Sequence, residues 1–88
     1  MQKYLAEFLG SLFFMYVILA TGNPIAIGAA LTLAVLLASN ISGGHINPMV
    51  SLVMASAGKL NTNDLIPYMV AQVLGGLVGL EIYKRFQM

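Results

Sequence analysis

The residues best suited to chemistry lie together in one short segment near the middle of the chain. This segment reads Ser42-Gly43-Gly44-His45-Ile46-Asn47-Pro48. Two glycines and a proline disfavour a continuous helix, so irregular backbone is predicted here. Such backbone leaves peptide carbonyls and amides free to bond other groups. The chemistry it favours is hydrogen bonding to a polar solute.

The rest of the chain offers little for catalysis or metal binding. It has one histidine, no cysteine and three acidic residues, which stand far apart at Glu7, Asp64 and Glu81. No second histidine, cysteine or acid stands at metal spacing from His45, so we interpret that ring as a brace for the loop rather than a metal ligand or proton relay. We therefore expect no enzyme, no metal site and no cofactor.

Composition places the chain in a membrane. Of its 88 residues, 59% are hydrophobic and 8% are charged, where soluble chains carry roughly 25% charged residues. A mean hydropathy of +0.88 can be hidden from water only in lipid or in a far larger core. A net charge of +1 with no basic run excludes a nucleic-acid surface. We expect an integral, multi-pass membrane protein, in a membrane that the sequence does not identify.

Three apolar runs are long enough to approach a bilayer crossing. They cover residues 4–21, 25–41 and 65–83, and Gly22-Asn23-Pro24 separates the first two. Small residues recur at four-residue spacing in each run, which favours close packing of helices in lipid. With the short helix described next, the runs predict an all-α membrane fold that forms one unit over residues 1–88.

The fourth predicted element is too short to cross the bilayer. Residues 48–57 make about 15 Å of helix against a hydrocarbon core of roughly 30 Å. Asn47 suits the cap of this helix, Pro48 its first position and Gly58 its end. We interpret it as a re-entrant half-helix. The irregular segment before it must then be buried in protein or face a water-filled cavity.

The start of this half-helix favours neutral solutes. Its dipole places partial positive charge at Pro48, and Asn47 offers an amide donor beside it. Extended carbonyls of residues 43–46 would form a ladder of acceptors that leads to the same point. Cations are repelled there, whereas an uncharged molecule can pass from one hydrogen-bonding group to the next.

One acidic residue and several aromatic residues also have expected roles. Glu7 lies inside the first apolar run, where an acid costs roughly 2.5–3.5 kcal/mol to insert unless it has a partner. Four aromatic residues near the ends of the runs are interpreted as anchors at the membrane interface, namely Tyr4, Tyr68, Tyr83 and Phe86.

Three motifs together resemble a known family. The segment from Ser42 to Val50 resembles the first Asn-Pro-Ala loop of the aquaporin and glycerol-facilitator family. Residues 6–10 (Ala-Glu-Phe-Leu-Gly) are similar to the start of the family's first helix, and residues 71–76 (Ala-Gln-Val-Leu-Gly-Gly) to its third helix. The resemblance covers nearly the whole chain but only one of the two inverted repeats of a family member. It implies three transmembrane helices plus one re-entrant half-helix.

The resemblance also implies roles for individual residues. Asn47 becomes the pore asparagine, and Glu7 and Gln72 brace the loop by hydrogen bonds to its backbone. Three alternatives stay open: Glu7 is an interface residue near Lys3, Gln72 only joins helices, or Asn47 with Pro48 is a plain helix cap. The carbonyl ladder is supplied by Gly43, Gly44, His45 and Ile46.

Three positions depart from the family pattern. Met49 stands where the family usually has alanine, so a larger and flexible side chain enters the midplane contact. Val50 follows it, and the filter arginine that the second repeat normally supplies is missing. Ile27 falls where many water-selective members present an aromatic residue. The resemblance therefore implies an apolar and wider filter.

The predicted function is passive flux of water or small neutral solutes such as glycerol, through a pore completed by a second copy in the opposite orientation. Lys3 and Lys59 would lie on one side of the membrane and Lys84 and Arg85 on the other, so positive charge sets no strong orientation. Two alternatives remain: a non-conducting membrane interaction protein, and a truncated half of a longer channel.

Overall fold

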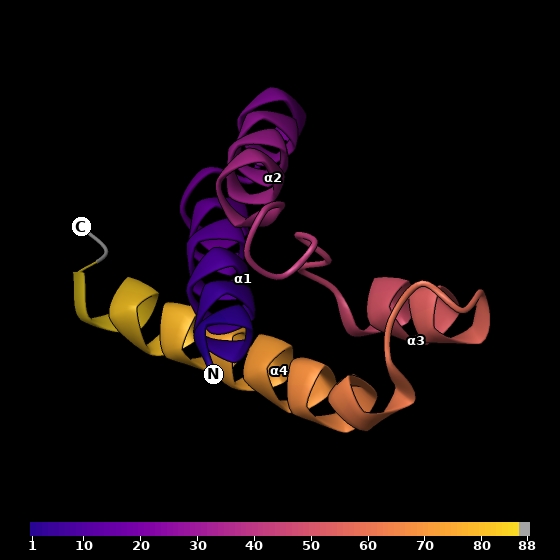
Figure 1. Ribbon diagram of the computed structural model, residues 1–88. Helices are drawn as coiled ribbons and strands as arrows, with labels where there is room; N and C mark the ends of the chain where they lie inside the picture. The colour runs from indigo at the N-terminus through magenta and orange to yellow at the C-terminus, as the bar shows by residue number, and fades with distance from the viewer. Residues whose placement is uncertain (87–88) are drawn as a thin grey trace.

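The computed structural model describes residues 1–86, which form four helices and, within that range, no strand. The helices are α1 (Gln2–Thr21), α2 (Pro24–Ala38), α3 (Pro48–Ser56) and α4 (Thr62–Phe86). In Figure 1, α1 and α2 lie side by side, α4 crosses α1, and α3 lies beside the first turns of α4. The irregular segment runs from the end of α2 to the start of α3.

The pair α1 and α4 packs closely because glycines leave room for the neighbouring backbone. A Cβ atom placed on Gly79 would lie 2.7 Å from the carbonyl oxygen of Leu12, and one on Gly75 would collide with the carbonyl oxygen of Phe8. Neither position can admit a larger residue unless the helices separate. The small residues spaced along α4 therefore allow close van der Waals contact with α1, the kind of contact that joins helices in lipid.

Burial in this chain is the reverse of that in a soluble protein. The two largest side chains that are fully buried are Glu7 and Ser51. Large apolar side chains instead lie on the outside of every helix, and examples are Leu9, Leu37, Leu52 and Leu77. A molecular surface with so many apolar side chains is suited to contact with lipid or with other apolar helices rather than with water.

The end of α2 leads directly into the irregular segment. The helix ends at Ala38, three residues before the expected limit, and hydrogen-bonded turns follow, in which Ser42 N donates to Ala38 O at 2.8 Å. Gly43 and Gly44 then have φ angles of 91° and 65°. Because this left-handed region is open to glycine at no steric cost, the two glycines stop the helix and turn the chain back.

Helix α3 is short, and its sequence defines both of its ends. The side-chain oxygen of Asn47 accepts a hydrogen bond from Met49 N at 2.8 Å, and Pro48 occupies the first helical position. Gly58, with a φ angle of 78°, follows its end. The nine residues from Pro48 to Ser56 give about 14 Å of helix, less than half of a hydrocarbon core of roughly 30 Å.

Two helices are long and apolar enough to cross a membrane, judged by length and composition: α1 with 20 residues and α4 with 25. Helix α4 extends the expected range 65–83 at both ends, and at its start the Asn61 side chain accepts a hydrogen bond from Asn63 N at 2.9 Å. Helix α2 is apolar but has 15 residues, which corresponds to about 22 Å.

Candidate functional site

The carboxylate of Glu7 lies at the centre of the site and is completely buried. Its Oε2 accepts hydrogen bonds from Ser42 Oγ at 2.5 Å and His45 N at 3.0 Å, and its Oε1 accepts from Ile46 N and Gln72 Nε2, both at 2.8 Å. The two backbone N–H groups and the amide can only donate, so they are satisfied by an ionised carboxylate. Four donors offset the cost of burying this charge.

The remaining N–H groups at the start of the segment also have partners. Gly43 N donates to Ser39 O at 3.1 Å, and Gly44 N donates to the hydroxyl of Ser42 at 3.2 Å. The backbone donors from Gly43 to Ile46 are therefore all bonded within the chain, which holds the segment in one conformation.

The carbonyl oxygens of residues 43–46 are in the opposite situation. Within residues 1–86, none of these four oxygens accepts a hydrogen bond from the protein. In a trans peptide the carbonyl points away from the N–H group of the next residue, and the chain has no cis bond in its described part. The carbonyls of Gly44 and His45 therefore point away from Glu7, which binds the N–H groups of the same peptides.

Ile46 holds an unusual backbone conformation at the end of this row. Its φ angle is 59°, a region that costs a β-branched residue about 1–3 kcal/mol. Two features hold it there: its N–H group is bonded to Glu7, and its side chain, 4% exposed, packs with Ala34 and Ala38. The backbone is thus kept in place by contacts on both sides.

A second group of polar side chains connects the segment to α3 and α4. His45 Nδ1 lies 2.8 Å from Ser51 Oγ, and Gln72 Nε2 also donates to Ser51 Oγ at 2.8 Å. Gln72 was expected to bond the backbone of the loop, but it contacts the loop through Glu7 and Ser51. The N–H groups of His45 and Ile46 are already bonded to Glu7, so Gln72 instead supplies a further donor to the carboxylate.

The residues at the start of α3 lie next to this network. Asn47 uses its side-chain oxygen to cap the helix, and its amide nitrogen has no partner among the described residues. Pro48 and Val50 are half-buried, whereas the side chain of Met49 is 60% exposed and makes no part of the core. An amide group without a protein partner and an exposed large apolar side chain therefore lie at the same end of the half-helix.

Ile27 is the one predicted site residue that stands apart from the others. It is half-buried near the beginning of α2, whereas the loop follows the end of that helix. Ala38 lies 11 positions after Ile27, which corresponds to a rise of about 17 Å. The structure thus groups residues 43–50 with Glu7 and Gln72 and leaves Ile27 at a different level of the molecule.

Three residues of the network were not found from the sequence: Ser42 as a side-chain donor, Ser51 and Tyr68. Tyr68 was interpreted as an interfacial anchor, but it is 2% exposed and its hydroxyl donates to Ser42 O at 2.7 Å. Two signals were available. Ser51 is the only polar residue between Pro48 and Ala55, and Tyr68 lies four positions before Gln72, on the same face of α4.

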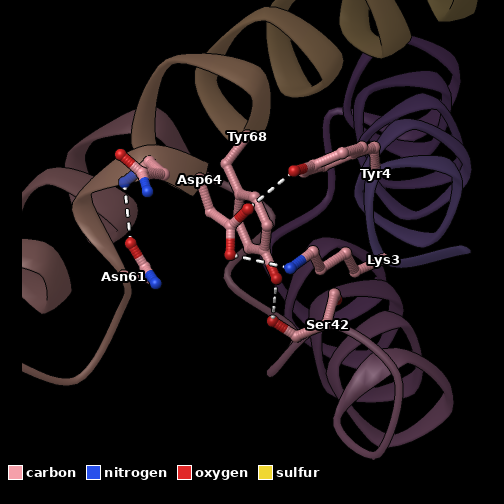
Figure 2. Close-up of polar contacts among 7 residues, drawn as sticks. Lys3, Tyr4, Ser42, Asn61, Asp64 and Tyr68 are labelled. Atoms are coloured by element: carbon pink, nitrogen blue, oxygen red, sulfur yellow. Dashed lines mark hydrogen bonds and ion pairs between the residues drawn. The ribbon is translucent and has the colours of Figure 1, made fainter. Parts of the chain in front are cut away.

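The acid near the start of α4 also has partners that the sequence did not indicate. Asp64 accepts a bond from Tyr4 and pairs with Lys3, the residue that was considered as a neighbour of Glu7 (Figure 2). The interface alternative for Glu7 is therefore wrong, because the carboxylate of Glu7 bonds to the loop and the ammonium group of Lys3 bonds to Asp64.

The sequence of the chain is similar to one known protein family and to several of its members. The chain matches the family model described as "Major intrinsic protein" over residues 1–88. It is 38% identical to glycerol uptake facilitator protein-like 6 of Lactiplantibacillus plantarum, over 98% of this chain and 44% of that protein. It is also 38% identical to aquaporin-8 of Rattus norvegicus, over 94% of this chain and 36% of that protein. With aquaporin Z of Brucella melitensis the identity is 37%, over 93% of this chain and 42% of that protein. The chain thus spans less than half the length of these relatives.

Proposed function

The chain belongs to the major intrinsic protein family, and from that premise we propose that it is one half of a membrane channel for water or small neutral solutes such as glycerol. It is an integral membrane protein, and the proposed activity is passive conduction rather than catalysis. Of the three relatives compared above, two are named aquaporins and one is named glycerol uptake facilitator protein-like 6. These names support the two solute classes.

In the proposed architecture α1, α2 and α4 cross the bilayer and α3 enters it halfway. The lengths of α1 and α4 and the apolar surface of α2 support the crossings. The length of α3 supports the half-crossing, because about 14 Å of helix reaches only the midplane. The single unit over residues 1–88 is then one of two repeats that together enclose a pore.

The observation that carries the proposal is the division of polar groups in the loop. Glu7, Ser42 and Ser39 take the N–H groups of residues 43–46, while the four carbonyl oxygens keep no protein partner. Irregular backbone at membrane depth is tolerated where it lines a water-filled cavity. A row of fixed acceptors of this kind replaces the hydrogen bonds that a neutral solute leaves behind in water.

The row of carbonyls leads to the amide of Asn47 at the start of α3. The positive end of the helix dipole lies at the same place, and both disfavour cations. Met49, which projects beside them, gives the junction a larger apolar side chain than an alanine would. With Ile27 at the other level, the proposed pore is apolar apart from its carbonyls and amide, which favours small uncharged solutes.

A second unit is required because one half-helix closes only one side of such a pore. We infer that the second unit is another copy of the chain in the opposite orientation. Lys3 and Lys59 lie near the start of α4, and Lys84 and Arg85 lie near its end. Asp64 and Lys84 are 20 residues apart on α4, which is about 30 Å. Two basic residues at each end give the positive-inside bias little to act on.

The function is tested by osmotic shrinkage of vesicles that contain the purified chain, with water, glycerol and urea as solutes. Asn47→Asp keeps a residue that caps helices well but replaces the amide donor by an anion. We expect water and glycerol flux to fall roughly 2- to 10-fold, since a lost hydrogen bond to a solute is worth about that factor. The matched control, Asn23→Asp, makes the same change at the exposed cap of α2 and should conduct like the unaltered chain. Flux equal to empty vesicles in the unaltered chain rejects conduction and favours a non-conducting interaction protein.

Orientation is tested separately with tags on the two termini. If copies insert both ways, each tag is labelled from both sides of the membrane, and glutaraldehyde yields a crosslinked dimer. Tags labelled from one side each reject the inverted pair of identical chains. That result favours a second half on another polypeptide or on a longer chain, in line with the 36–44% of each relative that this chain covers.

A further inference from the structure

Tyr68 connects the start of the loop to the beginning of α4. Its ring is almost completely buried, and its hydroxyl donates to the carbonyl oxygen of Ser42 at 2.7 Å, as Figure 2 shows. The ring packs against His45, with a distance of 5.3 Å between ring centroids. Tyr68 thus contacts the loop at both Ser42 and His45.

The position of Tyr68 is in turn defined by residues at the end of the molecule. Asp64 pairs with the ammonium group of Lys3 at 2.8 Å and accepts a bond from the Tyr4 hydroxyl at 2.6 Å (Figure 2). The ring of Tyr4 meets the ring of Tyr68 edge to face, with centroids 5.9 Å apart. We call Lys3, Tyr4 and Asp64 the Asp64 cluster. It joins the first turn of α1 to the first turn of α4, and it covers the ring of Tyr68 on one side.

Ser42 is consequently held from two directions. Its hydroxyl donates to Glu7 on α1 at 2.5 Å, and its carbonyl accepts from Tyr68 on α4. Among the carbonyls of residues 42–46, that of Ser42 is the only one that accepts a hydrogen bond from the protein, within the part of the chain that the structure describes. The row of unpartnered carbonyls therefore begins at Gly43.

We propose that Tyr68 is a positioning residue that fixes where the row of solute-binding carbonyls begins, and that the Asp64 cluster keeps Tyr68 in place. The part of this inference that concerns solute binding rests on the proposed channel function. The structural part does not: the Tyr68 hydroxyl removes one carbonyl from the row and anchors the first peptide of the loop.

Amide hydrogen exchange, measured by NMR on the full chain in detergent micelles, tests this role directly. Tyr68→Phe removes only the hydroxyl and leaves the ring contacts with Tyr4 and His45. We expect exchange at the N–H groups of residues 44–46 to become roughly 2- to 10-fold faster, because the net free energy of one hydrogen bond corresponds to about that factor. Amides in the middle of α1 and α2 should keep their rates, because the loop opens without the helices.

Tyr16→Phe is the matched control. Tyr16 is a half-buried tyrosine on α1 whose hydroxyl makes no hydrogen bond within residues 1–86. Exchange in this variant should equal that of the unaltered chain. Two results overturn the proposal: loop amides in Tyr68→Phe that exchange as slowly as in Tyr16→Phe, or an equal acceleration of loop and helix amides, which would mean that Tyr68 only stabilises the whole fold.

Asp64→Asn tests the second step of the proposal. The amide keeps an acceptor for Tyr4 but loses the ion pair with Lys3, whose side chain is 39% exposed. A partly exposed pair contributes little, so the acceleration at residues 44–46 should be smaller than in Tyr68→Phe and should disappear when salt screens the pair in both proteins. An acceleration larger than that of Tyr68→Phe would show that Asp64 acts on the loop by another route.

Flux measurements separate this inference from the proposed function. The loop stays mostly in its native position after loss of one bond, so Tyr68→Phe should lower water flux less than Asn47→Asp does. If the unaltered chain does not conduct but its loop amides respond as expected, the channel function fails and the positioning role of Tyr68 stands. If the chain conducts and the loop amides do not respond, the channel function stands and the positioning role of Tyr68 fails.

Discussion

The chain contains two Asn-Pro pairs that use the same local device in different surroundings. Asn23 caps α2 by accepting hydrogen bonds from Ile25 N and Ala26 N, and Asn47 caps α3 by accepting from Met49 N. In both pairs the proline takes the first helical position, and the residue before the asparagine, Gly22 or Ile46, lies in the left-handed region. Locally, the two helix starts are built alike.

The two pairs differ in what precedes them. Before Asn23, the turn is exposed, and a Cβ atom on Gly22 would meet nothing within 4 Å. Before Asn47, the residues from Gly44 to Ile46 are buried, and the carboxylate of Glu7 binds two of their N–H groups from 38 and 39 residues away. The same dipeptide is a plain helix start in one place and part of a candidate site in the other. The difference is made by a distant carboxylate rather than by the motif.

The largest expected effect comes from removing that carboxylate. Glu7→Gln leaves one acceptor oxygen and puts an amide donor in place of the other, so at least one buried N–H group loses its partner, whereas the Ser42 hydroxyl can turn to accept from the new amide and donate to Ala38 O. An unsatisfied buried group costs about 1–3 kcal/mol and a hydrogen bond to a charged group is worth about 1.5–3 kcal/mol, so the chain should lose roughly 2–6 kcal/mol of stability. Thermal unfolding in detergent, followed by circular dichroism, measures this loss.

Thr21→Val is the matched change at the other Asn-Pro pair. It removes the hydroxyl that accepts a bond from Asn23 N at an exposed turn, where water replaces it, and the unfolding temperature should stay close to that of the unaltered chain. Equal shifts in the two variants would contradict the distinction between the two regions.

The next largest change in stability is expected from replacing one glycine in each region, Gly10 beside the loop and Gly28 in α2. A Cβ atom on Gly10 would lie 2.5 Å from Cδ1 of Ile46, whereas one on Gly28, near the start of α2, would meet nothing within 4 Å. Gly10→Ala should displace Ile46 and cost about 1–3 kcal/mol. Gly28→Ala should instead stabilise by about 0.4–1 kcal/mol, because it restricts the unfolded chain. The methyl signals of Ile46 in NMR spectra should move only in Gly10→Ala, and unmoved Ile46 signals in that variant would show that the added methyl group does not press on the loop.

The smallest difference in stability is expected between the two caps themselves. Asn23→Ala and Asn47→Ala should each cost about 0.5–2 kcal/mol, since each removes one capping side chain. Their unfolding temperatures should therefore be similar, while vesicle shrinkage slows only in Asn47→Ala, which also loses the amide donor. Similar flux in both variants would mean that Asn47 serves only as a cap.

Local sequence signals predicted the elements well but not their connections. Asn47, Pro48 and Gly58 mark the ends of α3 because caps and breakers act within a few residues. The end of α2 was placed at Ile41 because residues 39–41 carry no breaker, and the structure ends the helix at Ala38 as the chain turns back at Gly43 and Gly44. That turn depends on contacts with Val35 and Glu7, which no local pattern contains.

The hydrogen-bond partners of Glu7 and Tyr68 could also not be predicted from local sequence patterns. An acid inside an apolar run indicates that Glu7 needs partners, but residue type alone does not say that three of its four partners come from the loop. Tyr68 was misplaced for a related reason: near the end of an apolar run, an aromatic residue that points to lipid and one that points to the core look alike. Only the packing of α4 against the loop distinguishes them.

The central claim is that the unpartnered carbonyls before Asn47 form a passage that a second copy completes. Osmotic water permeability of vesicles, measured over a series of rising protein-to-lipid ratios, tests it most directly. The account predicts that permeability per chain rises with density, as inverted copies find one another, and then levels off. Permeability equal to that of empty vesicles at every density, with the chain shown to be inserted, would contradict it.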